Sequence, residues 1–241
     1  GGYIEAKTAG WEETDDLRLS PKEPDVKKSM NTHLHILEAY TNLYRVWKTE
    51  ESKAKLHHLI RIFLDKIIDP QSFHFHLFFD ADWTVRSDID SYGHDIEGSW
   101  LLCEAAEVLE KQDVLHEVEQ VALEMAGVTK NEGLDKKGGL YYEKTGSHLL
   151  DRFDWWPQAE AVVGFFNAWQ LSGEKEYLDL TKKSWDFIQQ FIIDTQKGEW
   201  FWGVDSELKT LPNDKINGWK APYHNSRMCM EMMRRIEKIL K

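Results

Sequence analysis

The sequence is dominated by amphipathic segments in which apolar residues recur at spacings of three and four. Leu34, Leu37 and Tyr44 follow this spacing in the first of them. Because it places apolar side chains on one face of an α-helix, each segment predicts a helix that packs against others. The predicted helices are 30–47, 56–68, 94–110, 113–127, 157–171, 175–194 and 223–240. The short connections at 48–51 and 172–174 predict antiparallel helical hairpins and an all-α fold, with Gly173 as a left-handed helix end.

The segments between the predicted hairpins have strand character. Aromatic residues alternate with histidines over 73–79, and 138–142 and 199–203 are similarly aromatic. These segments predict short β-hairpins at one end of the helical assembly. Residues 1–26 show no helical or strand pattern and are predicted to be an irregular lead-in. The length fits one domain over 1–241.

Composition excludes several classes of partner. Asp and Glu number 42 against 30 Lys and Arg, a net charge of −12 that would repel a phosphate backbone, so nucleic acid is not expected as a partner. No segment approaches the run of about 20 apolar residues that a membrane helix needs. Cys103 and Cys229 are too few for a disulfide scaffold, and the first thirty residues lack the order of a signal peptide. These features predict a reduced, cytoplasmic protein that does not bind membranes.

Four short segments recur at intervals of about 60 residues, each where the first helix of a hairpin begins. They are 35–38, 94–97, 157–160 and 224–227, and the fourth position is always charged: Glu38, Glu97, Glu160 and Arg227. Residues three apart share a helix face, so each segment presents polar groups to one side. Hairpins that repeat in this way can stack as an open solenoid or close into a ring, and periodicity leaves both open.

The repeat makes three histidines candidates for acid–base chemistry. A single histidine at a helix start is usually structural, but His35, His94 and His224 occupy equivalent positions and should converge. Histidine titrates near neutral pH and can both take up and release a proton. Glu97, Glu160 and Arg227 are predicted to orient these imidazoles or bind hydroxyl groups.

Tryptophans near these positions predict a sugar-binding surface, because sugars present apolar C–H faces to an indole ring. Trp156 and Trp219 flank the third and fourth segments, and Trp100 lies one turn after Glu97. Core packing is the alternative role for all three, and it is most plausible for Trp100.

A metal site is the competing interpretation, and its signals are weak. His74 and His76 form an H-x-H that could bind zinc from a strand, whereas His33 and His35 point about 200° apart on a helix. Neither a glycine-rich phosphate loop nor a nucleophile elbow is found in the sequence. No metal and no cofactor are therefore predicted.

The four motifs at 31–40, 91–97, 155–161 and 222–227 together resemble the N-acylglucosamine 2-epimerase superfamily. They are most similar to its members that act on cellobiose. The resemblance implies an (α/α)6 barrel, a ring of helical hairpins around a sugar-binding cleft. It also implies that this chain is the C-terminal portion of the barrel, incomplete at the N-terminus, because a family arginine and tyrosine have no counterpart here.

The resemblance implies a cofactor-independent reaction that inverts C2 of the reducing-end sugar of a cellobiose-type disaccharide. The sugar ring opens, and an enediol intermediate is reprotonated on its opposite face. His94 and His224 would be the acid–base pair, with His35 assisting ring opening. The implied substrate-binding residues are Asn31, Glu97, Trp100, Trp156, Glu160, Trp219 and Arg227, with Trp156 under the reducing-end sugar and Trp219 under the second sugar.

Two alternatives remain open from the sequence. One is an N-acylglucosamine 2-epimerase or a mannose isomerase, because aldose–ketose isomerisation shares the enediol. The other is a non-catalytic carbohydrate-binding fragment that lacks the N-terminal arginine. In every case the expected partner is a small sugar, and the sequence predicts no particular oligomeric state.

Overall fold

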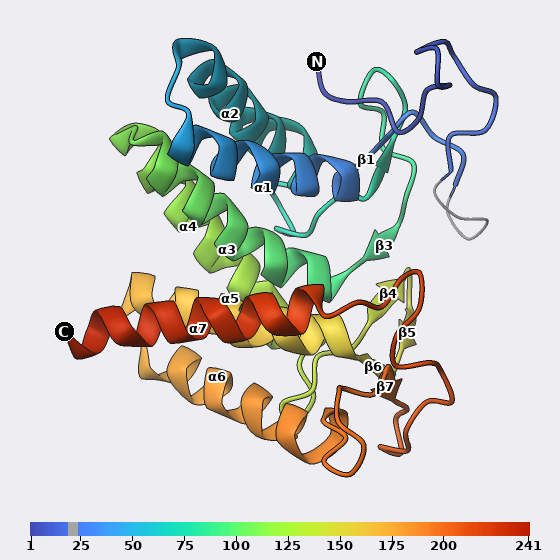
Figure 1. Cartoon of the computed structure of the whole chain (residues 1–241), viewed down its shortest axis with the longest axis vertical. Coiled ribbons are helices and arrows are strands. Elements are labelled where there is room, and N and C mark those ends of the chain that lie inside the picture. The colour runs from blue at the N-terminus through green and yellow to red at the C-terminus, as the bar shows by residue number, and fades with distance from the viewer. Residues whose placement is uncertain (19–23) are drawn as a thin grey trace. The chain divides into compact units, whose positions relative to one another are not determined.

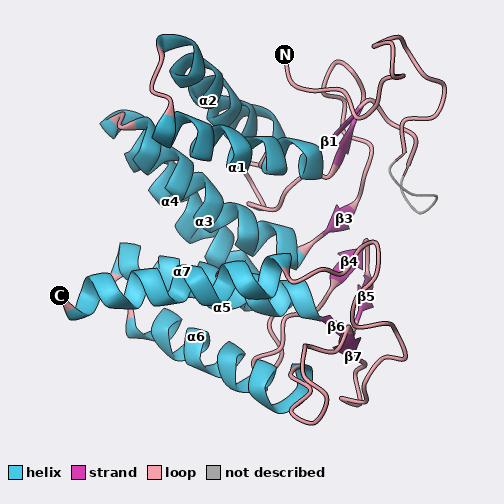
Figure 2. Ribbon diagram, viewed as in Figure 1, coloured by secondary structure: helices cyan, strands magenta, loops and turns pink. Residues whose placement is uncertain are grey.

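Five of the seven helices begin and end within two residues of the positions that the periodicity predicts, and the other two differ by six or seven residues at one end or both. A computed structural model describes residues 1–18 and 24–241. Its helices are joined in hairpins, and the all-α prediction is confirmed (Figures 1 and 2). They are α1 (Met30–Val46), α2 (Glu50–Ile62), α3 (Tyr92–Leu109), α4 (Gln112–Val128), α5 (Trp155–Ser172), α6 (Lys175–Phe187) and α7 (Tyr223–Leu240).

Local capping explains where the first two hairpin helices and α5 begin or end. The Ser29 side chain accepts a hydrogen bond from the Thr32 amide at the start of α1. Thr49 and Ser52 form a reciprocal capping box, so α2 begins at residue 50, earlier than the predicted 56. Gly173 ends α5 with φ of 73°, which confirms its predicted left-handed conformation.

The second helix of each hairpin ends in the same way, a repeat that the sequence analysis did not identify. A π-helical turn follows each one, at Phe63–Ile67, Thr129–Gly133 and Ile188–Ile192. An aspartate then closes a turn: Asp69, Asp135 and Asp194 each accept a hydrogen bond from the amide two residues further on, at 2.8, 2.8 and 2.9 Å. Asp side chains favour such turns because their short carboxylates reach the backbone.

The strands are shorter than predicted. Two-residue strands pair at β1 (Lys28–Ser29) with β2 (Phe78–Phe79) and at β6 (Phe153–Asp154) with β7 (Gly203–Val204). β3 (Ile89–Asp90) is equally short, and β4 (Glu143–Thr145) pairs with β5 (His148–Leu150).

The sequence predicts short β-hairpins at 73–79, 138–142 and 199–203, and in the structure these segments pair through two-residue strands and isolated antiparallel bridges. Phe73 and Glu199 adopt φ of 59° and 61°, and a left-handed residue interrupts an extended strand. In these three segments the isolated bridges are at Phe75, Phe79, Leu140 and Trp200.

The described chain forms two compact units, one of 1–90 with 101–121 and the other of 91–100 with 122–241. In the first unit α1 packs against α2. Their facing residues Leu34, Leu37, Leu56 and Leu59 are fully buried. In residues 1–18 and 24–26 no helix or strand occurs, and the rest of the predicted lead-in lies outside the described residues. The prediction of a single domain stays a prediction.

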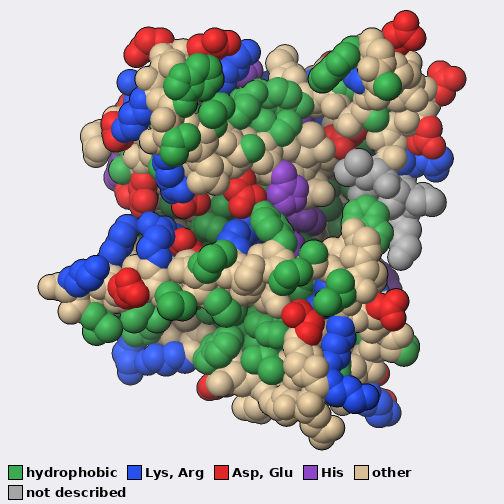
Figure 3. Space-filling model, in the orientation of Figure 1, with side chains coloured by type: hydrophobic (Ala, Val, Ile, Leu, Met, Phe, Trp, Pro, Cys, Tyr) green, Lys and Arg blue, Asp and Glu red, His purple; other side chains and the backbone are tan. Residues whose placement is uncertain are grey.

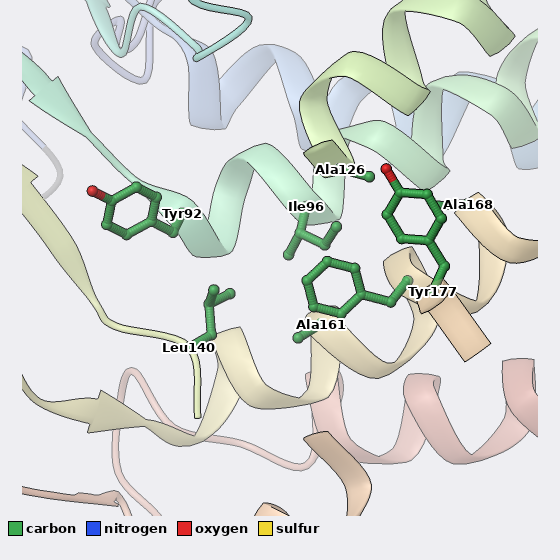
Figure 4. Packing of buried hydrophobic residues seen from close by; sticks show 8 residues of the cluster. Tyr92, Ile96, Ala126, Leu140, Ala161, Ala168 and Tyr177 are labelled. Carbon is green, nitrogen blue, oxygen red and sulfur yellow. The ribbon is translucent and has the colours of Figure 1, made fainter. Parts of the chain in front are cut away.

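The second unit is organised around α5, which packs against both α6 and α7. Residues 155–168 of α5 are all buried, including its polar side chains. A cluster around Ile96, Ala161 and Phe165 joins α5 to the start of α3 (Figure 4). A Cβ atom on Gly164 would lie 2.4 Å from the Ile96 side chain, so this glycine permits the close approach of the two helices. That approach brings Glu160 and Glu97 together.

α7 is amphipathic, and several of its apolar side chains stay exposed although the helix packs on α5. Met228 is buried, whereas Met230, Met233 and Ile236 are 64%, 63% and 43% exposed. Apolar side chains accordingly reach the surface along this helix (Figure 3). Within the described residues, no helix is both long and apolar enough to cross a membrane.

Candidate active site

The second unit brings two of the three predicted histidines onto one tryptophan. His94 lies in the first turn of α3, Trp156 in the first turn of α5 and His224 in the first turn of α7. The His94 ring centroid is 4.6 Å from that of Trp156, and the His224 ring centroid is 5.5 Å from it. The convergence of these positions, which the repeat predicts, is therefore present in this unit.

Gly93 permits the contact between α3 and the indole. A Cβ atom at this position would lie 2.5 Å from the Trp156 ring and 2.9 Å from Pro157. A larger residue would displace the indole from His94, because real Cβ contacts are not that short. Gly93 lies within the second motif, but a glycine there does not by itself predict this contact.

Two buried carboxylates lie next to the imidazole of His224. Glu97 and Glu160 are each 1% exposed. Glu160 Oε1 lies 2.7 Å from His224 Nδ1 and accepts a hydrogen bond of 2.8 Å from Arg227 Nη2, which also contacts Glu97. Trp100 Nε1 donates to the second oxygen of Glu160, at 3.0 Å. Every oxygen of Glu160 therefore has a partner.

The charge of this cluster is fixed by its partners. Burial alone would raise the pKa of Glu160, but the positive charge of Arg227 and the hydrogen bond with His224 outweigh it and hold the pKa below its ordinary value. Arg227 is in turn held between aromatic rings, 5.0 Å from the Trp100 centroid and 4.5 Å from that of Tyr223. The guanidinium thus provides the positive charge that the two carboxylates require.

His94 has a different partner from His224. Ser91 Oγ lies 2.8 Å from His94 Nδ1, so this nitrogen contacts a neutral hydroxyl, whereas Nδ1 of His224 contacts a carboxylate. Ser91 is buried, and its carbonyl accepts the Asp95 amide at the start of α3. Sequence reasoning missed Ser91, whose only signal is its place three residues before the histidine.

The three predicted tryptophans differ sharply in exposure. Trp100 is 2% exposed and Trp156 9%, whereas Trp219 is 65% exposed in the loop before α7. The structure favours the packing alternative for Trp100, because its indole is buried against Glu160 and Arg227. Trp156 has a small exposed surface beside the histidines, whereas most of the Trp219 side chain is exposed.

His35 and Asn31 lie in the first unit, one turn apart on α1. The His35 side chain is 45% exposed, and its Nδ1 is 3.5 Å from Glu38 Oε2. Their roles in ring opening and in sugar binding stay predictions. The neighbouring His33 is fully buried, with Nδ1 2.6 Å from the Ser29 carbonyl and Nε2 accepting from the Tyr3 amide at 3.0 Å, so it has a structural role.

The carboxylate cluster also has the composition of a cation site. Single ligand atoms of Glu97, Glu160 and His224 lie within 4.8 Å of one another. Arg227 Nη2 contacts both carboxylates, so the guanidinium already stands where a cation would bind them. This arrangement fits an arginine-neutralised cluster better than a metal centre.

Comparison with known proteins shows to which family this fold and this site belong. Residues 5–227 match the N-acylglucosamine 2-epimerase (GlcNAc 2-epimerase) family, and the chain belongs to that family. The family resemblance seen in the sequence is thereby confirmed.

Two relatives are similar in sequence to this chain over nearly its whole length. The cellobiose 2-epimerase of Bacteroides fragilis is 46% identical over 236 residues, which cover 96% of this chain and 60% of that protein. The corresponding enzyme of Dictyoglomus turgidum is 37% identical, again with 60% of its length covered. This chain therefore spans about 60% of the length of the relatives that it matches.

Solved structures agree with these relatives. A sugar epimerase from a ruminal bacterium superposes with a TM-score of 0.93 at 35% identity, covering 97% of this chain and 60% of that one. Cellobiose 2-epimerase from Bacillus thermoamylovorans gives 0.89 at 38% identity, covering 93% and 58%. These matches confirm the predicted fold class, helical hairpins of the (α/α)6-barrel type. A D-mannose isomerase, at 20% identity and a TM-score of 0.76, shares the fold.

Proposed function

We propose that this chain carries the proton-transfer residues of a cofactor-independent sugar 2-epimerase that acts on cellobiose-type β-1,4-disaccharides. The observation that supports this most is the contact of His94 and His224, from two different helices, with the same buried indole. Inversion at a carbon requires proton donors on both of its faces, and two imidazoles beside one stacking surface meet that requirement. The relatives named as cellobiose 2-epimerases support the choice of substrate.

In the proposed reaction the sugar ring first opens, because only the open-chain aldehyde makes the C2 proton acidic. One histidine removes that proton through Nε2, and the electron pair moves through C1 to the carbonyl oxygen to give an enediol-type intermediate. The other histidine, which enters the reaction as the imidazolium, then donates a proton to C2 on the opposite face, while the electron pair returns from the oxygen and the C1 carbonyl re-forms. The reverse reaction exchanges the two roles, so each histidine acts as both base and acid.

The surrounding groups hold the imidazoles in usable orientations. Glu160 can accept the Nδ1 proton of His224, which leaves the lone pair of a neutral ring on Nε2. Ser91 Oγ engages Nδ1 of His94 and fixes the same orientation. Trp100 and Arg227 act on Glu160 rather than on the sugar, and Trp156 supports the sugar beside both histidines.

The proposed route predicts isotope exchange with solvent. Cellobiose incubated in deuterated water with the intact protein should gain deuterium at C2 as it epimerises, because an imidazole exchanges its proton with solvent. Nuclear magnetic resonance of the recovered disaccharides measures the label. Complete epimerisation without label would contradict the enediol route. A ketose product would instead indicate an aldose–ketose isomerase, and binding without turnover a carbohydrate-binding protein.

Removal of metal ions is expected to leave the rate unchanged. The positive charge beside Glu97 and Glu160 comes from Arg227, and no proposed step uses a metal ion. The measurement compares epimerisation before and after dialysis against EDTA. Loss of activity that zinc restores would show that the carboxylate cluster binds a catalytic metal.

A further inference from the structure

The loop that precedes α7 contains a fully buried lysine. Lys220 has 0% exposure, and its ammonium donates to Glu199 Oε1 at 3.0 Å and to the Lys215 carbonyl at 2.8 Å. It also lies 5.4 Å from the Trp155 ring centroid. A lysine is almost never fully buried unless it is paired, because removing its charge from water is costly. These contacts therefore determine where the loop can lie.

The buried lysine is adjacent to the exposed tryptophan. Asn217 Oδ1 accepts hydrogen bonds from the Trp219 amide at 2.8 Å and from the Lys220 amide at 2.9 Å, and the Asn217 amide donates to the Lys220 carbonyl at 3.0 Å. The turn is thus closed around Trp219. Because the next side chain points into the protein, that of Trp219 is held outward, where it is 65% exposed.

Glu199 connects this turn to the start of α7. Its Oε1 also accepts a hydrogen bond of 3.1 Å from Asn225 Nδ2, and Asn225 directly follows His224. Glu199 adopts φ of 61°, a conformation that favours glycine and that the surrounding contacts must hold in place. A second lysine, Lys215, joins the same two loops through Asp194 and the Gly198 carbonyl.

We propose that Lys220 is a positioning residue that sets specificity for a disaccharide, because its buried ion pair with Glu199 fixes the exposed indole of Trp219 as the platform for the second sugar ring. The inference rests on the proposed function for the identity of the ligand. It extends that function to a residue that touches no substrate. Lys220 acts through Trp219, so its effect should be confined to ligands that reach the second ring.

The test measures binding of reduced sugars, which lack the aldehyde and cannot react. Calorimetry gives the dissociation constants of cellobiitol and glucitol for the intact protein and for Lys220→Met, Trp219→Ala and the double variant. We expect Lys220→Met to weaken cellobiitol binding by about tenfold, a typical effect of losing one aromatic contact, and to leave glucitol binding unchanged. The double variant should bind cellobiitol no more weakly than Trp219→Ala does.

The control is Lys209→Met, which removes a lysine of the same loop whose ion pair with Glu207 is exposed, and it should change neither constant. If Lys220→Met does not fold, Lys220→Met combined with Glu199→Gln removes both charges and carries the same expectation. Unchanged cellobiitol binding, an equal loss for glucitol, or additive effects of the two single variants would overturn the inference. Absence of epimerisation by the unaltered protein would instead count against the proposed function alone, because binding of reduced sugars needs no reaction.

Discussion

Replacement of His94 or His224 by Asn is expected to slow epimerisation of cellobiose by at least about 10²-fold, because each residue transfers a proton in both directions of the reaction. Asn keeps the polarity and approximate size of the ring but cannot take up a proton. The two losses should be similar, although the histidines contact different partners, Ser91 and Glu160. Initial rates from the glucose- and the mannose-configured disaccharide measure the effect.

The single variants should nevertheless differ in isotope exchange. Each remaining histidine still addresses its own face of C2, so each variant should exchange the C2 proton of the epimer whose proton faces that histidine, without inverting it. His58→Asn is the control, because His58 is exposed on α2 and should be dispensable. A folded His94→Asn protein that kept more than about a tenth of the unaltered rate would contradict the two-histidine mechanism.

The helices could be predicted because their signal is local. Apolar residues at spacings of three and four mark a buried face wherever the helix packs, so the seven predicted segments all became helices. The convergence of His94 and His224 followed from the same repeat. The pairing in the strand-like segments is brief for an equally local reason, since Phe73 and Glu199 adopt left-handed conformations in turns that follow Asp69 and Asp194.

The partners within the site could not be predicted, because they join distant parts of the chain. Arg227 and Glu97 are 130 residues apart in sequence, and their contact depends on how α7 and α3 pack against α5. Periodicity identified both residues as polar and suitably placed, but not that one would neutralise the other. Ser91 and Lys220 were missed for a different reason. A serine or a lysine in a connecting segment does not by itself indicate a functional role.

Loss of Arg227 is expected to have the largest effect on stability. Arg227→Met would leave Glu97 and Glu160 buried without the guanidinium that both contact, and breaking a buried pair in this way costs about 3–5 kcal/mol. Urea unfolding at pH 7 measures the free energy of unfolding. Arg234→Met is the matched control on the same helix, because its side chain is 44% exposed and the change should cost less than about 1 kcal/mol.

The pH dependence of the free energy of unfolding should have the opposite sign in Arg227→Met. In the unaltered protein the pKa of Glu160 lies below its ordinary value of 4.5, so its contribution to stability is present above that pH and is lost as the pH falls through the depressed pKa. Without Arg227 the burial of the two carboxylates would raise their pKa values, and protonation on folding would then stabilise the variant as the pH falls.

The difference in unfolding free energy between the two proteins should therefore shrink between pH 7 and pH 5.5. Adding Glu97→Gln to Arg227→Met should recover part of the loss at pH 7, because one of the two unpaired charges is then gone. A loss that stayed constant with pH and did not respond to Glu97→Gln would show that Arg227 stabilises the protein by packing between Trp100 and Tyr223, and not by neutralising the carboxylates.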